Sequence, residues 1–240
     1  MGWSYSFWKP NFYKQDLPPG NFLAYYAKNF DTVEVDSTFY RIPRSQTVTE
    51  WKQQTPKGFL FSLKFPQKIT HVKMLQSAQE ETSVFFERVT LLEEKLGVLL
   101  LQFPPMFRLD HFPLLKDYLA TLPKGFRYAI EVRNKSLLNT ELYELLRDHN
   151  VALAWVDAIK MPLTAEVTAD FVYVRWEGDR KTVTGTLGKA ETDRSEEIKA
   201  WAQRLVPFLE KGTPVFGYFS KYYSGFPPAD VQELLKRNKQ

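Results

Sequence analysis

The sequence predicts an α/β protein of the TIM-type (β/α) barrel class, in a single domain that spans residues 1–240. Strand-like apolar runs alternate with amphipathic, helix-like segments along the chain, which is typical of a parallel sheet covered by helices. The chain lacks the G-x-G-x-x-G turn that usually marks an open, dinucleotide-binding sheet. The predicted strands also end in polar side chains, as they do where a barrel builds its active site.

Seven segments are predicted strands because they are rich in β-branched and aromatic residues. They are residues 32–35, 59–65, 98–103, 128–133, 151–157, 171–175 and 214–219. Amphipathic segments before, between and after them are predicted helices: 21–29, 77–96, 111–122, 139–149, 195–211 and 228–238. No Ser/Gly linker divides the chain, so we expect one domain.

The composition narrows the class of protein. With 44% hydrophobic and 15% aromatic residues the chain can fill a large core, which argues against disorder. A formal charge of +4 is compatible with an anionic ligand but too small to favour nucleic acid. The absence of cysteine excludes disulfides, thiolate metal sites and cysteine nucleophiles. The sequence has neither a membrane-length apolar stretch nor a signal-peptide pattern, so we expect a cytoplasmic protein without a membrane partner.

Polar residues stand at the ends of the predicted strands: Asp36, Lys64, Gln102, Glu131, Arg133, Asp157, Arg175 and Ser220. In a barrel these ends meet at one mouth, so we expect a shared site there. Side chains alternate along a strand, which places Glu131 and Arg133 on the interior face with Ala129. Buried charges need partners, so Glu34, Lys64, Glu131 and Arg133 are predicted to form one network. The alternative is that these residues are strand ends in solvent.

The chemistry of the mouth can be interpreted in two ways. Arg133 and Arg175 are predicted to clamp an anion, with Lys64 as a third positive group, because guanidinium forks match phosphate and carboxylate. The alternative is that each arginine only pairs with a neighbouring carboxylate. The candidate catalytic residues are Lys64 and the three carboxylates of Asp36, Glu131 and Asp157. The carboxylates would act as general acid and base or bind a divalent metal. The residues single out no cofactor.

Aromatic and further polar residues complete the predicted ligand-binding set: Trp3, Tyr5, Tyr40, His71, Glu177 and Tyr218. Rings at a barrel mouth stack on sugars or bases, although core and rim packing is the alternative. His71 is the one histidine in a loop predicted to lie at the mouth, and a purely structural loop histidine is its alternative. The Gly/Thr-rich segment 177–190 is either a mobile lid or a solvated loop.

Six fragments, taken in order, resemble the domain of unknown function 72 (YecE-like) family: GWSYSFWKPNFY, VEVDSTFYRIP, LGVLLLQFPP, IEVR, YVRWEG and GYFSKYYSG. The resemblance implies a TIM-type barrel and no particular reaction. It also implies a short strand before Gly2, where this sequence has only Met1, so we expect the first strand to be missing or truncated. Glu177 stands where the family pattern generally has histidine, so a mechanism that needs an imidazole there would fail.

Three functional classes follow from these residues. The first is an enzyme, such as a hydrolase, lyase or isomerase, that acts on a small phosphate- or carboxylate-bearing ligand. The second is a ligand-sensing or scaffolding protein without turnover. The third is a metal-dependent nucleic-acid enzyme, which the mild charge does not favour. Because a barrel hosts many functions, the fold alone does not rank them, and the sequence does not set the oligomeric state.

Overall fold

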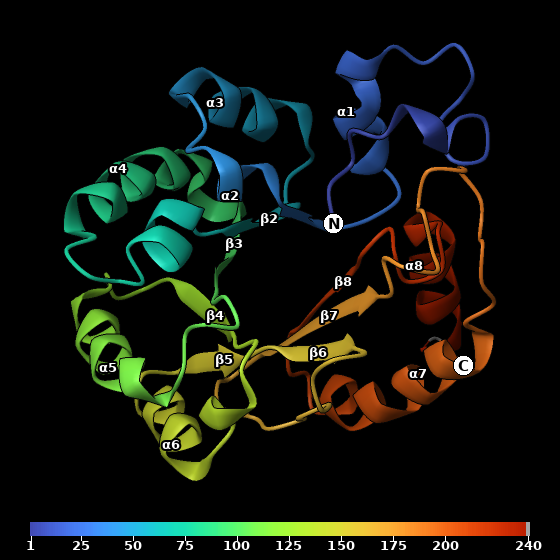
Figure 1. Cartoon of the computed structure of the whole chain (residues 1–240). Helices are drawn as coiled ribbons and strands as arrows, with labels where there is room; N and C mark the ends of the chain where they lie inside the picture. Colours follow the sequence, from blue (N-terminus) through green and yellow to red (C-terminus); the bar gives the residue numbers. More distant parts are fainter. Residues whose placement is uncertain (239–240) are drawn as a thin grey trace.

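The computed structural model describes residues 1–238, in which parallel strands curve around a common centre and the helices lie outside them (Figure 1). The strands are β1 (Thr32–Val35), β2 (Leu60–Lys64), β3 (Leu96–Gln102), β4 (Arg127–Glu131), β5 (Val151–Leu153), β6 (Trp155–Ala158), β7 (Val172–Gly178) and β8 (Val215–Phe219). The α-helices are α1 (Phe22–Tyr26), α2 (Ser37–Tyr40), α3 (Ser45–Gln54), α4 (Gln79–Val89), α5 (Phe112–Thr121), α6 (Thr140–Asp148), α7 (Ser195–Glu210) and α8 (Pro227–Arg237). A π-helical turn, η3 (Lys68–Val72), follows β2.

The strands form two parallel sheets, which confirms the α/β class. One sheet has the order β1-β2-β3-β4-β5 and the other has the order β6-β7-β8. Only Ala154 separates β5 from β6, so the predicted strand 151–157 pairs with β4 through its first half and with β7 through its second. The predicted parallel strands are therefore present. Within residues 1–238, however, no strand ladder joins β8 to β1, so the strands do not form the closed ring of a complete barrel.

The first residues of the chain lie between the free edges of β8 and β1. The Met1 nitrogen donates to the Phe219 carbonyl of β8, and the Gly2 amide donates to the Glu34 carbonyl of β1, both at 2.8 Å. In the described part of the chain no strand precedes β1. A cavity of about 220 Å³ remains between these edges, α1 and α8.

Four helix assignments differ from the sequence prediction: the short helix α2 was not predicted, and α1 is shorter than the predicted helix 21–29. Helix α3 was not predicted, because only Val48 and Trp51 are buried along its ten residues and its apolar stripe is therefore narrow. The predicted helix 77–96 is shorter in the structure. Helix α4 ends at Val89 and a 3-10 segment follows, in which Glu93 adopts a positive φ of 51° before β3 begins at Leu96.

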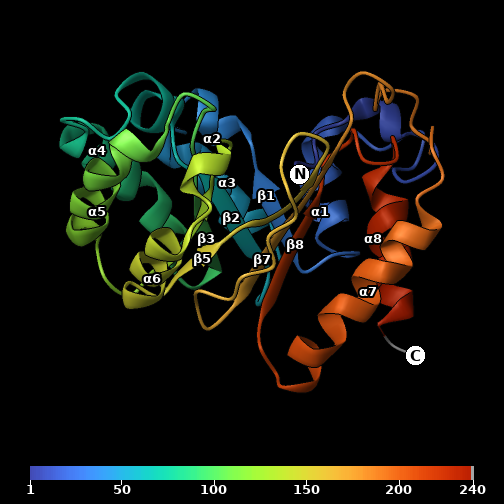
Figure 2. The ribbon, with the colours of Figure 1, turned by 60° about the horizontal axis from the view of Figure 1, so that its bottom comes forward.

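Alternation along the strands divides the core into an interior and an outer layer. Interior positions include Leu100, Ala129, Ala152 and Tyr173, which form one apolar cluster. The outward positions of the β6-β7-β8 sheet pack on α7 and α8, which lie side by side (Figure 2). Polar residues that share the interior face are therefore held above this cluster, towards the carboxyl ends of the strands. Among residues 1–238, no helix has both the length and the apolar character needed to cross a bilayer.

Candidate functional site

A cavity of about 340 Å³ opens at the carboxyl ends of β1, β2, β3, β7 and β8, and we call it the mouth pocket. Most of the predicted site residues line it: Tyr5, Asp36, Tyr40, Lys64, His71, Gln102, Arg133, Arg175, Glu177 and Ser220. They come from separate strand ends and from the loops that follow them. The fold therefore gathers at one place side chains that are up to 215 positions apart in the sequence (Tyr5 to Ser220).

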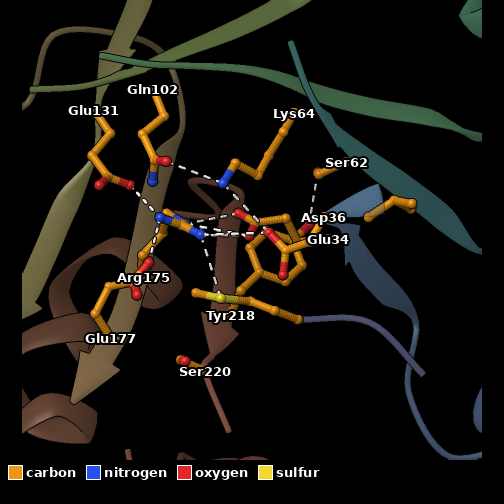
Figure 3. A network of polar contacts seen from close by, with 12 residues as sticks. Glu34, Asp36, Ser62, Lys64, Gln102, Glu131, Arg175, Glu177, Tyr218 and Ser220 are labelled. Carbon is orange, nitrogen blue, oxygen red and sulfur yellow. Dashed lines mark hydrogen bonds and ion pairs between the residues drawn. The ribbon is translucent and has the colours of Figure 1, made fainter. Parts of the chain in front are cut away.

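Arg175 on β7 is the centre of a buried ionic network at the base of the mouth pocket (Figure 3). Its Nε donates to Glu34 Oε2 at 2.9 Å and its Nη2 donates to Glu34 Oε1 at 2.8 Å. Its Nη1 donates to Glu131 Oε2 and lies 2.5 Å from Glu177 Oε1. Asp36 Oδ1 is more distant, at 3.9 Å from Nη2. Glu34, Glu131 and Arg175 are each at most 1% exposed, so these charges are shielded from water.

Strand alternation explains why these charges meet. Tyr173, Arg175 and Glu177 occupy every second position of β7 and point to the interior, where the Tyr173 hydroxyl also donates to Glu34 at 2.6 Å. Burial alone would raise the pKa of Glu131, but the guanidinium groups of Arg175 and Arg133 outweigh burial and hold that pKa well below its usual range. The Glu131 carboxylate therefore remains ionised. Because the ion pairs are buried, removing one partner would leave the other as an uncompensated buried charge.

The contacts of Arg175 favour the ion-pair interpretation over the predicted clamp. Its nitrogens already contact Glu34, Glu131 and Glu177, so it has little capacity left for a ligand. Arg133 is different. Its Nε donates to Glu131 at 2.8 Å, its nearest other carboxylate contact is Nη2 to Glu177 at 4.0 Å, and its side chain is 34% exposed. Arg133 can therefore still offer N–H groups to a ligand.

Arg180 and Lys221 also line the mouth pocket, and sequence reasoning did not select them. The Arg180 guanidinium lies 4.8 Å from the ring centre of Tyr222, and the Lys221 ammonium lies 4.9 Å from the same ring. Within residues 1–238 neither side chain has a carboxylate within 4.0 Å. Their signal in the sequence was their position directly after β7 and β8, where phosphate sites of TIM barrels often lie.

Lys64, at the end of β2, is the fourth cationic group available at the pocket. Its ammonium donates to Gln102 Oε1 at 3.1 Å and lies 3.6 Å from Asp36 Oδ1. It also lies 4.5 Å from the ring centre of Phe39. The Asp36 carboxylate is 35% exposed and is therefore accessible from the pocket.

His71 belongs to the π-helical turn η3, and its half-buried ring lines the mouth pocket. Such turns often occur at functional sites. The hydroxyl of Thr70 lies 2.9 Å from Nδ1, which orients the ring, and Phe39 meets the ring edge-on at 4.8 Å. Burial, followed by the positive charges of Arg133 and Lys64, lowers the pKa of His71 to about 4. The imidazole is therefore neutral near pH 7.

Four predicted site residues do not line the mouth pocket. Glu131 lies beneath it in the buried network. Asp157 points outward and accepts a hydrogen bond from Trp201 Nε1 at 2.8 Å, so its predicted catalytic position does not agree with the structure. Trp3 packs edge-on against Trp51 and Phe61 in the core rather than at the mouth. Tyr218 lies deeper in the interior, where its hydroxyl donates to Ser62 at 2.7 Å.

The segment 177–190, which the sequence allowed to be either a mobile lid or a solvated loop, is fixed to the body at several points. Gly178 has a φ of 68°, and a Cβ at this position would overlap the Tyr222 carbonyl, so the close approach of the two loops requires glycine. Asn11 donates to the Gly188 carbonyl at 2.8 Å. Glu191 accepts hydrogen bonds from the amides of Thr184 and Gly185. These contacts favour a packed wall over a mobile lid.

In residues 1–238 no group of three or more His, Asp or Glu side chains is arranged to hold a metal ion. The carboxylates nearest the pocket are instead engaged by arginine and lysine. The geometry therefore gives the metal-dependent alternative no supporting observation.

The comparisons with known proteins agree with the resemblance in the sequence. The family model described as "Protein of unknown function DUF72" matches residues 1–240. The UPF0759 protein YecE of Escherichia coli K12 is 27% identical over 217 residues, which cover 80% of this chain and 76% of YecE. The UPF0759 protein YunF of Bacillus subtilis 168 is 28% identical over 148 residues, 57% of this chain and 51% of YunF.

Two solved structures share the fold. A DUF72 family protein from Thermotoga maritima MSB8 superimposes with a TM-score of 0.81 and 25% identity, covering 100% of this chain and 97% of its own. A DUF72 family protein from Enterococcus faecalis V583 gives a TM-score of 0.76 and 23% identity, covering 91% of this chain and 93% of its own. These likenesses support the architecture, and they name no ligand or reaction.

Proposed function

This chain belongs to the DUF72 family of proteins of unknown function, and from that premise we propose that it binds a small anionic ligand in the mouth pocket. The ligand bears a phosphate or carboxylate group. Its anionic group contacts cationic side chains that have N–H groups left over after their contacts within the protein, and two of these side chains, Arg180 and Lys221, have no carboxylate partner among residues 1–238. The buried network beneath the pocket holds the strand ends in place, and the ligand does not enter it.

One observation carries this proposal: four cationic side chains with unused N–H groups surround a single pocket, Lys64, Arg133, Arg180 and Lys221. The other cation, Arg175, is balanced by Glu34 and Glu131 beneath it. Only Asp36 and Glu177 add negative charge to the lining. Guanidinium groups match the geometry of phosphate and carboxylate and stay charged at all physiological pH values. An oxyanion of one or two charges therefore fits this pocket.

We further propose that the two sheets are parts of one TIM-type barrel, in which β5 and β6 count as one strand. On this assignment the mouth pocket lies at the end where barrel enzymes place their active sites. Arg180 and Lys221 then belong to the loops after the last two strands, which supply the phosphate site in many barrels. The position and the charge of the pocket support the same ligand class.

Binding can be tested by thermal unfolding and titration calorimetry with inorganic phosphate, sulfate, citrate and a short oligonucleotide. A ligand at about 100 times its Kd stabilises the folded protein by roughly 2.7 kcal/mol. For a chain of this size that corresponds to a rise of about 2–4 °C in Tm per kcal/mol.

Arg180→Gln and Lys221→Gln should each weaken phosphate binding by about tenfold, since each removes one charged contact worth about 1.4 kcal/mol. Arg204→Gln is the matched control, because Arg204 also lies 4.8 Å from an aromatic ring, that of Trp201, but outside the pocket. The proposal fails if no small anion binds, or if all three variants bind phosphate equally well. If the protein binds the oligonucleotide more tightly than the small anions, the ligand is a nucleic acid instead.

Catalysis is the second candidate function, and the placement of His71 favours it. An imidazole on a π-helical turn that lines the same pocket as Asp36 and Lys64 is placed where it could act as a general acid or base. The test follows the release of inorganic phosphate from a panel of phosphate monoesters. His71→Asn should abolish release while retaining the binding of phosphate itself. If no monoester is hydrolysed, hydrolysis of this class is excluded and the binding proposal stands.

A further inference from the structure

We propose that the ligand carries an apolar arm beside its anionic group, and that the arm lies in a second compartment of the same mouth. This inference rests on the proposed anion site and narrows its ligand class. The ligand is an aryl or branched-acyl phosphate or carboxylate rather than an unsubstituted anion or a wholly polar sugar phosphate.

The second compartment is a cavity of about 520 Å³, which we call the arm pocket. It lies at the carboxyl ends of β4, β6 and β7, next to the mouth pocket. Arg133, Glu177 and Arg180 line both cavities. The two cavities therefore share one wall, and a ligand bound by these three residues has access to both.

The two compartments differ in the chemistry of their walls. Beyond the shared residues, the mouth pocket is lined mainly by charged and hydrogen-bonding groups such as Asp36, Lys64 and Ser220. The arm pocket is also lined by the charged residues Glu131, Lys160, Asp179 and Lys181, but it has an apolar wall formed by Pro105, Val132, Val156, Ala158, Ile159 and Met161. Ligand sites commonly join an apolar surface to a few polar groups that fix orientation. The arm pocket supplies an aliphatic surface, whereas the apolar groups of the mouth pocket are mainly the rings of Tyr5, Phe39, Tyr40 and Tyr222.

Ile159 is the most water-exposed of the large hydrophobic side chains that we place in this wall. Its side chain is 72% exposed, although it stands at the edge of a cavity with other apolar groups. Met161 nearby is partly buried and unbranched, so it can adjust to different shapes. Covering these side chains with a hydrocarbon group removes apolar surface from water on both partners.

Arg133 is placed to contact both parts of such a ligand. Its Nε is held by Glu131, which fixes the guanidinium at the shared wall. The edge of a guanidinium donates to an oxyanion, while its flat face stacks on an aromatic ring. The two cavities, about 340 and 520 Å³, each lie within the roughly 300–1,000 Å³ that is common for ligand sites.

The test compares methyl phosphate with phenyl phosphate by titration calorimetry, and acetate with 3-phenylpropionate for the carboxylate class. Phenyl phosphate should bind the wild-type protein about tenfold more tightly than methyl phosphate, which corresponds to burying about 60 Å² more apolar surface. Ile159→Ser should remove most of this preference and leave methyl phosphate binding unchanged. Val156→Thr, which keeps the side-chain shape, should reduce the preference in the same direction.

Leu187→Ser is the matched control, because Leu187 is 58% exposed and lines neither compartment. Equal binding of methyl and phenyl phosphate overturns the arm pocket and leaves the anion site intact. A phenyl preference that survives Ile159→Ser and Val156→Thr places the arm elsewhere and also overturns it. Failure of every phosphate and carboxylate to bind overturns the proposed function instead, so the two failures are distinguishable.

Discussion

Replacing Arg175 with methionine removes the centre of the buried network while filling a similar volume. Glu131 keeps a cationic partner in Arg133, and Glu177, which is 9% exposed, keeps Arg133 at 4.0 Å. Glu34 is affected most, because it is 0% exposed and Tyr173 becomes its main remaining donor. Glu34 must then either stay charged without a cation or take up a proton.

Proton uptake sets the upper limit of the cost. For a glutamate with an ordinary pKa of about 4.3, protonation at pH 7 costs about 1.36 kcal/mol for each of 2.7 pH units, or roughly 3.7 kcal/mol. Removing one partner of a buried ion pair costs about 3–5 kcal/mol in general. We therefore expect Arg175→Met to lower the free energy of unfolding by about 3–4 kcal/mol at pH 7.

The stability loss of Arg175→Met should increase as the pH rises. In the variant the folded state holds a proton that the unfolded state releases at pH 7, so raising the pH favours unfolding. The loss should shrink to about 1 kcal/mol at pH 5, where protonation costs little. In the wild-type protein the lowered pKa of Glu131 has the opposite effect: its contribution is present above about pH 4.3 and is lost as the pH falls further.

Urea unfolding at pH 5, 6 and 7 measures this difference between the two proteins. Arg147→Met is the matched control, because Arg147 pairs with Glu166 at 2.7 Å on the surface, with side chains 46% and 41% exposed. Its loss should stay under about 1 kcal/mol at every pH. A loss for Arg175→Met below about 1 kcal/mol at pH 7, or one that does not shrink towards pH 5, would refute the buried-network reasoning. A variant too unstable to fold at pH 7 should still fold at pH 5.

Three shorter predictions concern other parts of the site. The His71 imidazole should show no titration by NMR between pH 8 and 5.5, because burial and neighbouring cations lower its pKa to about 4; since the unfolded chain binds that proton more readily, His71 costs stability as the pH falls below about 6.5. Asp157→Ala should lower stability by about 1 kcal/mol through its lost hydrogen bond to Trp201 and leave phosphate affinity unchanged, so a large loss of affinity would return Asp157 to the site. Gly178→Ala should destabilise the protein by more than about 1 kcal/mol, because alanine disfavours the positive φ and its Cβ would overlap the Tyr222 carbonyl; an unchanged urea midpoint would contradict this.

The sequence predicted the strand ends well because strand formation and side-chain alternation are local properties. Every predicted strand overlaps an observed one, and Glu131 and Arg133 meet at the interior end as the alternation requires. The same rule, applied to residues 151–157, would have placed Asp157 correctly. Ala152 and Ala154 face the interior, so Trp155 and Asp157 face the helices. The prediction was wrong because Asp157 was placed at the mouth from its position at the strand end alone, and the alternation of side chains between the two faces was not applied to it.

Pairing across the fold was beyond sequence reasoning. Arg175 and Glu34 are 141 positions apart, and their contact depends on the way the two sheets come together. The sequence shows that several charges reach the mouth, but it does not show which of them neutralise one another. The clamp prediction therefore chose Arg175, which the fold buries among carboxylates, and did not include Arg180, which the fold leaves at the pocket rim.

The distribution of charge in this site has a physical cause. A charged side chain at an inward-facing strand position is buried in the interior, where a charge is stable only if it is paired with an opposite charge. A charged side chain on a loop stays partly hydrated and can remain without one. Arg175 follows the first rule, and Arg180 and Lys221 follow the second. Glu177 connects the two groups, since it pairs with Arg175 below and forms part of the wall between the mouth pocket and the arm pocket above. The buried network thus sets the shape of the site, while the loop cations are the groups from which affinity for a ligand should come.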